Sequence, residues 1–186
     1  MFADMRMSIL KSIIALFLEA STAVAGQKDT KTQKAELEKL LDAALPFAQQ
    51  MLATHGEFYP YGATMDTTGK ISNVGGYTDD EHPKSTEVID LLKQAYRRNG
   101  EAGKIMACAL VYDIRTIPPG QTDKTDAVAV DLDHRDGLSL VMVYPYKIGA
   151  DKKVQLATPY AVKGANGIFK SQTKGEPDAG ANRAPR

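Results

Sequence analysis

The stretch Ala127–Tyr146, AVAVDLDHRDGLSLVMVYPY, decides the predicted fold. From 128 to 132, valines and a leucine alternate with small or acidic residues, which is the pattern of a strand that buries one face. The dipeptide Asp136-Gly137 is a strong hairpin signal. The apolar run Leu138–Tyr146 then supplies the returning strand. The stretch therefore predicts an antiparallel hairpin.

Further strands are predicted on both sides of this hairpin. Ile105–Ile114 is nearly all apolar, which is typical of a strand that is buried on both faces. Glu57–Met65 and Lys70–Tyr77 flank the turn sequence Asp66–Gly69, so they predict a second hairpin. Val154–Val162 is expected to form another strand.

Two helices are predicted. Over Lys34–His55, leucines and alanines recur at three- and four-residue steps, the spacing of a helix with one apolar face. Pro46 lies inside this pattern, so we expect either a kink there or a second helix that starts there. In the other helix, Ser85 or Thr86 is the expected N-cap, and the buried stripe runs over Val88–Tyr96.

The order helix, two strands, helix, three strands predicts an α+β domain. Hairpin connections indicate an antiparallel sheet of about five to six strands with helices packed on it. The order of elements resembles the profilin-like and roadblock-like layouts, an analogy that does not extend to function. We expect the domain to span residues 31–170, between an N-terminal extension at 1–30 and a disordered tail at 171–186 that has little to bury.

Composition argues against several functional classes. The 186 residues contain 23 Lys plus Arg and 23 Asp plus Glu, whereas nucleic-acid binding needs a surplus of positive charge, so we expect none. The single cysteine, Cys108, lies in an apolar run and is expected to be a buried thiol. The three histidines lie far apart. We therefore expect no metal site and no cofactor.

The segment Met7–Ala25 leaves two alternatives. A short apolar core followed by Ala23-Val24-Ala25 has the outline of a secretory signal, with cleavage near Ala25 and export to the periplasm. The same residues also fit an amphipathic helix of a cytoplasmic protein. The segment is too short and too charged to span a membrane.

Two acidic clusters could carry chemistry. In the first, Asp131 and Asp133 share one face of a strand and are followed by His134 and Asp136, a set that could hold a metal or share a proton. Because apolar side chains occupy the opposite face, the aspartates are predicted to face solvent, at an ordinary hairpin tip. The second cluster, Asp79–His82, precedes a helix, whose dipole favours carboxylates there.

Tyr-Pro-Tyr occurs twice, at Tyr59–Tyr61 and at Tyr144–Tyr146. Proline cannot donate to a sheet ladder, so each unit marks an edge, a bulge or a strand end. Tyrosines in such places could form a rigid contact surface, or one ring of each pair could pack in the core. The predicted partner surface consists of Tyr59, Tyr61, Tyr144 and Tyr146.

The stretch Leu45–Val74 contains the heptapeptide Gly56–Gly62, GEFYPYG, followed by Met65-Asp66 and Gly69-Lys70-Ile71. It resembles a group of small uncharacterised bacterial proteins in which an amphipathic helix runs into a GEF-aromatic-Pro-aromatic-Gly strand and a D-x-x-G turn. The resemblance implies a helix that leads into a hairpin. It implies no activity.

No serine nucleophile motif and no phosphate-binding loop occurs in the sequence. We therefore expect a non-catalytic protein-binding module, immunity- or adaptor-like, with an unidentified protein partner or as a homodimer. One alternative is a small-ligand or metal-binding protein, or an enzyme with a dispersed site, that uses Asp131, Asp133 or His134. Another alternative is an exported envelope protein.

Overall fold

The computed structural model describes residues 29–80 and 82–169. They form two helices and seven strands. In chain order these are α2 (Thr30–His55), β1 (Tyr61–Asp66), β2 (Ile71–Gly75), α3 (Ser85–Glu101), β3 (Ile105–Thr116), β4 (Thr125–His134), β5 (Ser139–Ile148), β6 (Val154–Leu156) and β7 (Tyr160–Lys163).

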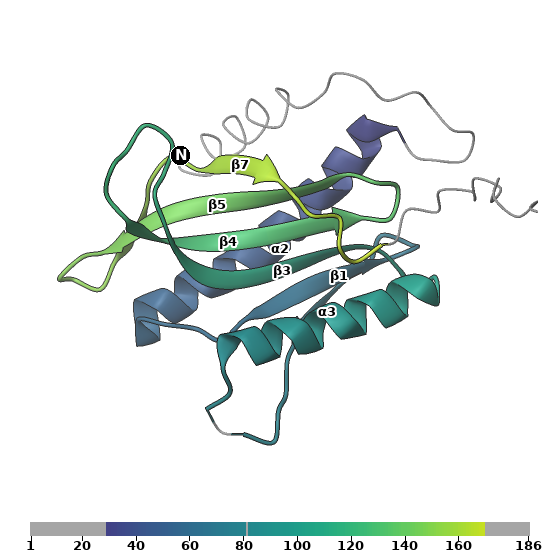
Figure 1. The fold of residues 1–186 in the computed structure, drawn as a ribbon, viewed down its shortest axis with the longest axis horizontal. Coiled ribbons are helices and arrows are strands. Elements are labelled where there is room, and N and C mark those ends of the chain that lie inside the picture. The colour runs from purple at the N-terminus through teal and green to yellow at the C-terminus, as the bar shows by residue number, and fades with distance from the viewer. Residues whose placement is uncertain (1–28, 81, 170–186) are drawn as a thin grey trace, which may run out of the picture.

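All strands belong to one antiparallel sheet in the order β2-β1-β3-β4-β5, so the predicted α+β class is confirmed (Figure 1). At the β5 edge, β6 pairs with Tyr146–Ile148 and β7 pairs with Leu140–Val143. The single strand expected over Val154–Val162 is thus two short strands. Pro159 separates them, because it has no N–H to donate to a continuous ladder.

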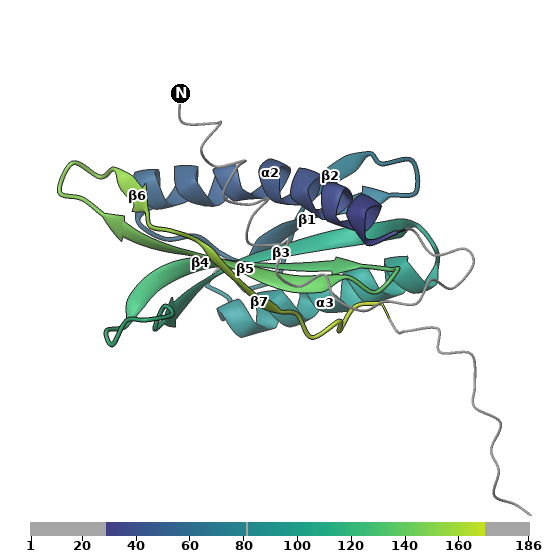
Figure 2. The same ribbon diagram turned by 90° about the horizontal axis from the view of Figure 1, so that it is seen from above.

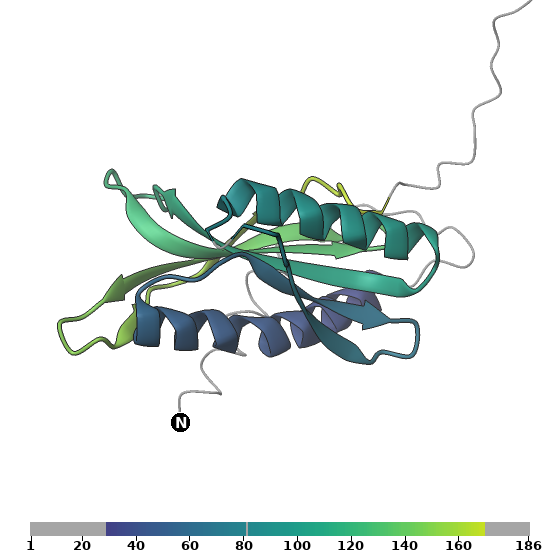
Figure 3. The ribbon, with the colours of Figure 1, turned by 90° about the horizontal axis from the view of Figure 1, so that it is seen from below.

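The two helices lie on opposite faces of the sheet, which gives three layers (Figures 2 and 3). α2 contacts β1, β2, β3, β4 and β6, whereas α3 packs mainly on β1 and β3. On the side of α3, the strands β4 and β5 are therefore left largely without a helix over them (Figure 1). The candidate site lies on this part of the sheet, on the side of α3.

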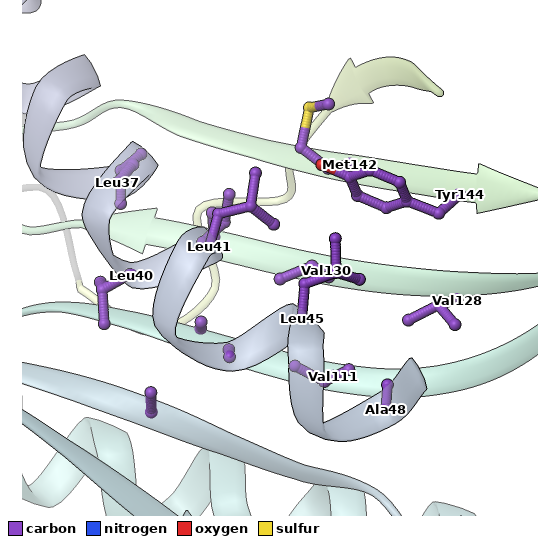
Figure 4. Packing of buried hydrophobic residues seen from close by; sticks show 14 of the residues in the cluster. Leu37, Leu40, Leu41, Leu45, Ala48, Val111, Val128, Val130, Met142 and Tyr144 are labelled. Carbon is purple, nitrogen blue, oxygen red and sulfur yellow. The ribbon is translucent and has the colours of Figure 1, made fainter. Parts of the chain in front are cut away.

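The larger core lies between α2 and the sheet. Leu37, Leu41 and Leu45 of the helix belong to one buried cluster with Val130 and Met142 of the strands (Figure 4). Burial of each such side chain contributes about 1.5–3 kcal/mol to folding. The leucines and alanines that recur at three- and four-residue steps therefore form the buried face of α2, as the sequence predicted.

Pro46 does not divide α2, which continues through it as one helix. Two residues later, the hydroxyl of Tyr61 accepts a hydrogen bond from the Ala48 N–H (2.8 Å) and donates one to the Ala44 carbonyl oxygen (2.7 Å). In an undisturbed helix these two backbone groups would bond to each other. A side chain of β1 therefore bridges the turn that contains the proline.

α2 ends at a glycine cap, whereas α3 begins without the serine or threonine cap that was predicted. Gly56 has a φ of 81° and its N–H donates to the Leu52 carbonyl oxygen, so α2 ends at a left-handed glycine cap. The predicted capping of α3 by Ser85 or Thr86 is wrong. The N-cap position is Lys84, without a side-chain capping bond, because Ser85 is already helical.

The described residues allow a test for membrane-spanning helices but do not include the possible signal segment. None of its helices combines the length and hydropathy that a crossing of the bilayer requires. The possible signal segment with cleavage near Ala25 lies outside the described residues, as does the tail at 171–186.

Candidate functional site

The structure divides the first acidic cluster between the two faces of the sheet. Asp131 and Asp133 point to the side of α3, where Asp133 lies directly opposite Cys108 of β3. His134 points to the side of α2 because successive strand residues alternate between faces. The tight turn after β4 places Asp136 beside the His134 ring. The four residues therefore do not form one site.

The prediction that the aspartates face solvent is wrong. Asp133 is only 3% exposed and Asp131 is only partly exposed. The reason is the segment Gly164–Phe169, which lies inside the predicted domain and which we call the crossing segment. It follows β7 and runs over the sheet toward α3 (Figure 1).

Hydrogen bonds hold the crossing segment at both ends. The Gly164 N–H donates to the Ser139 carbonyl oxygen (3.1 Å) and the Asn166 N–H donates to Ser139 Oγ (2.9 Å). Farther along, Arg97 Nε of α3 donates to the Gly167 carbonyl oxygen (2.9 Å). The final residue, Phe169, is buried in the cluster that contains Cys108 and part of α3.

The buried carboxyl groups shape the electrostatics of this face. Burial, and to a lesser extent the charge of Asp133, raises the pKa of Asp131 to about 6, while Lys93 of α3 acts in the opposite direction. Burial and the two carboxylates also raise the pKa of the Cys108 thiol well above its ordinary value. Cys108 is therefore protonated at neutral pH, which makes it a poor nucleophile.

His134 joins α2 to the hairpin on the opposite face. Its ring is fully buried, and its Nδ1 accepts a hydrogen bond from the Asp136 N–H (3.1 Å). The proton is therefore assigned to Nε2, which lies 2.9 Å from Glu36 Oε2 and donates to that carboxylate. Close by, Gln33 Oε1 of α2 accepts from the Leu138 N–H (3.1 Å). Both ring nitrogens are thus engaged within the fold.

The sequence analysis missed Gln33 and Glu36 as partners of the hairpin. They are separated from Leu138 and His134 by about a hundred residues of chain, so no local spacing reveals the contacts. One signal was present. Gln33 lies four residues before Leu37, so a polar side chain occupies the buried stripe of α2.

Of the four tyrosines that were predicted to form a partner surface, three are buried, so the prediction is wrong for these three. Tyr59 is 52% exposed, but Tyr61, Tyr144 and Tyr146 are buried. Their rings pack in the core beneath α2, and the Tyr146 hydroxyl reaches Asp113 Oδ1 (3.1 Å). The alternative of one buried ring in each pair therefore holds for Tyr59 and Tyr61, whereas both rings of the second pair are buried. A role of Tyr59 in binding a partner stays a prediction.

Large exposed hydrophobic side chains gather at one end of the sheet. β1 begins there and β2, β3 and β5 end there, as the strand register requires. Phe47 of α2 joins them, because its ring lies edge-on to Tyr61 with centroids 4.8 Å apart. Of the seven such side chains in the described residues, five lie at this end. We call it the apolar end, and its members are Phe47, Tyr59, Tyr77, Ile117 and Ile148.

The second acidic cluster lies in the loop that leads into α3. The Asp80 carboxylate accepts from the His82 N–H (2.9 Å), and its backbone carbonyl accepts from the Thr78 hydroxyl (3.1 Å). Glu81 lies outside the described residues. Over 29–80 and 82–169, no group of three or more His, Cys, Asp and Glu side chains is arranged to hold a metal.

The GEFYPYG stretch and the turn that follows connect α2 to the first hairpin. Asp66 Oδ1 closes this turn by accepting from the Thr68 N–H (2.8 Å) and the Lys70 N–H (3.0 Å). Gly69 follows with a φ of 86°, a backbone conformation that favours glycine. The resemblance to small bacterial proteins with this motif stays a prediction. The chain matches no protein-family model, no curated protein and no solved structure.

Proposed function

We propose that this protein is a non-catalytic protein-binding module, immunity- or adaptor-like, that contacts its partner through the apolar end. The observation that carries the proposal is that Phe47, Tyr59, Tyr77, Ile117 and Ile148 are exposed on segments at one end of the sheet. Exposed apolar and aromatic side chains in one region are typical of protein interfaces.

The state of the groups that would serve in catalysis supports the same proposal. His134 uses both ring nitrogens within the fold, so it offers no free base. The Cys108 thiol is buried and protonated. The hydroxyl groups of Tyr61 and Tyr146 are engaged in hydrogen bonds inside the domain.

Affinity capture from the native host tests the proposal, with a tag placed after Arg186. Three baits are compared: the wild-type chain, the double variant Tyr59→Ser/Ile148→Ser at the apolar end, and the control Val162→Ser. Val162 of β7 is also exposed, but it pairs with Val141 of β5, away from the apolar end. Circular dichroism and a thermal melt establish that all three baits are folded.

We expect one partner at near-equal amount with the wild-type and Val162→Ser baits, and at least a tenfold loss with the double variant, since a truncated interface anchor costs about 2 kcal/mol or more. Equal capture by all three folded baits would contradict the apolar end as the contact surface. A folded wild-type bait without any partner would contradict the binding-module proposal. Sedimentation of the bait distinguishes a foreign partner from a homodimer.

A further inference from the structure

The crossing segment passes directly over Asp133. In the strand register, Asp133 lies between Cys108 of β3 and Ser139 of β5, so the three side chains share one face. The segment is bonded to Ser139 through Asn166, and its last residue packs in the cluster that contains Cys108. Between these two points it can only run over the end of β4.

Buried oxygen atoms without hydrogen-bond partners belong both to this segment and to the face of β4 that it crosses. In the described residues, four buried side-chain nitrogen or oxygen atoms have no partner. Three of them belong to this place, namely Asp131 Oδ1, Asp133 Oδ1 and Asn166 Oδ1. Asp133 is only 3% exposed, so bulk water does not provide a hydrogen bond to its Oδ1.

All three atoms are acceptors, so they cannot satisfy one another unless a carboxyl is protonated. Two carboxylates and one amide oxygen are the ligand types that hard divalent cations prefer. Because the third member is an asparagine, this set is not among the groups of three His, Cys, Asp and Glu side chains that the described residues lack.

We propose that the crossing segment covers a site for one hard divalent cation, of the Ca²⁺ or Mg²⁺ class, with oxygen ligands from Asp131, Asp133 and Asn166. The site is separate from the apolar end. It differs from the expectation, drawn from the sequence, that the chain holds no metal. A bound cation would stabilise the position of the segment in which the Asn166 N–H donates to Ser139 Oγ.

Charges on neighbouring elements tune the affinity. Lys93 of α3 acts on Asp131 and competes with a bound cation. Arg97, one turn farther along α3, is directed to the Gly167 carbonyl oxygen. We therefore expect the charge-removing variant Lys93→Met to bind the cation more tightly than the wild-type chain.

The test uses the full chain, stripped with EDTA and desalted, then titrated with Ca²⁺ or Mg²⁺. The thermal midpoint of the wild-type chain should rise by about 5 °C or more at a hundredfold excess over Kd. Tb³⁺ gives a local readout, since Tyr112 is close enough to sense the Asp131 charge and can sensitise its luminescence. Added Ca²⁺ should displace Tb³⁺ from the site and so reduce the sensitised luminescence.

Matched variants locate the site. Asp133→Asn and Asp131→Asn should each weaken binding at least tenfold, and Asn166→Ala by several-fold, whereas Asp90→Asn, an exposed acid on α3, should bind as the wild-type chain does. Unchanged melting of the wild-type chain in millimolar Ca²⁺ and Mg²⁺ would overturn the proposal, as would undiminished binding by Asp131→Asn and Asn166→Ala. These two variants decide the question if Asp133→Asn does not fold.

Discussion

Substitution of Tyr61 by Phe should lower the free energy of unfolding, because it removes the hydroxyl oxygen that makes two hydrogen bonds to α2. The Tyr61 hydroxyl bridges the Ala48 N–H and the Ala44 carbonyl oxygen in the turn of α2 that contains Pro46. Tyr61→Phe keeps the ring, and with it the edge-on contact to Phe47. The variant therefore tests the bridge and leaves the aromatic packing in place.

The two hydrogen bonds set the expected magnitude. Each buried hydrogen bond contributes about 0.5–1.5 kcal/mol net, so loss of both bonds of Tyr61 should cost about 1–3 kcal/mol. The lower value applies if α2 tightens and the Ala48 N–H bonds directly to the Ala44 carbonyl oxygen. The higher value applies if Pro46 prevents that closure. We expect a loss of about 2 kcal/mol.

Urea unfolding followed by circular dichroism measures this loss. With a slope of about 2 kcal/mol per molar urea, the midpoint of Tyr61→Phe should fall by about 1 M. Tyr59→Phe is the matched control, because it removes a hydroxyl from a ring that is 52% exposed, and its cost should stay within about 0.5 kcal/mol. The bridge would be refuted if the two variants unfold at the same urea concentration.

Two further substitutions test other contacts of the fold. Gly62→Ala should lower the free energy of unfolding by about 3 kcal/mol or more, because its Cβ would overlap the Ala109 carbonyl oxygen and the Tyr96 hydroxyl. A thermal midpoint within a few degrees of the wild-type value would contradict this. A double-mutant cycle with His134→Ala and Glu36→Ala should give a coupling of about 1.5–3 kcal/mol, as expected for a hydrogen bond to a charged group. Additive losses in urea unfolding would show that the pair does not interact.

Much of the backbone followed from local patterns. The apolar run that starts at Ile105 predicted a strand buried on both faces, and this holds as far as Val111. Asp136-Gly137 predicted the β4–β5 turn, in which Gly137 has a φ of 105°. Such features depend on the residues themselves and on their immediate neighbours. Local patterns failed at Pro159, where the sequence did not reveal that β6 and β7 are separate strands.

The candidate site was harder to predict. The alternation in β4 correctly placed Asp131 and Asp133 on one face and the valines on the other. It could not tell whether anything covers the aspartate face. The partners of His134 on α2 were equally hidden, because Glu36 is far away in the chain.

The sequence by itself determined most of the secondary structure and the sides of the main strands, because these follow from periodicity and from backbone preferences over a few residues. Only the tertiary structure decided which faces are covered. Burial of Asp133 depends on where a segment some thirty residues later crosses the sheet, and on the bonds of that segment to Ser139 and Arg97. The free energy of such long-range packing is shared among distant residues, so no local stretch encodes it.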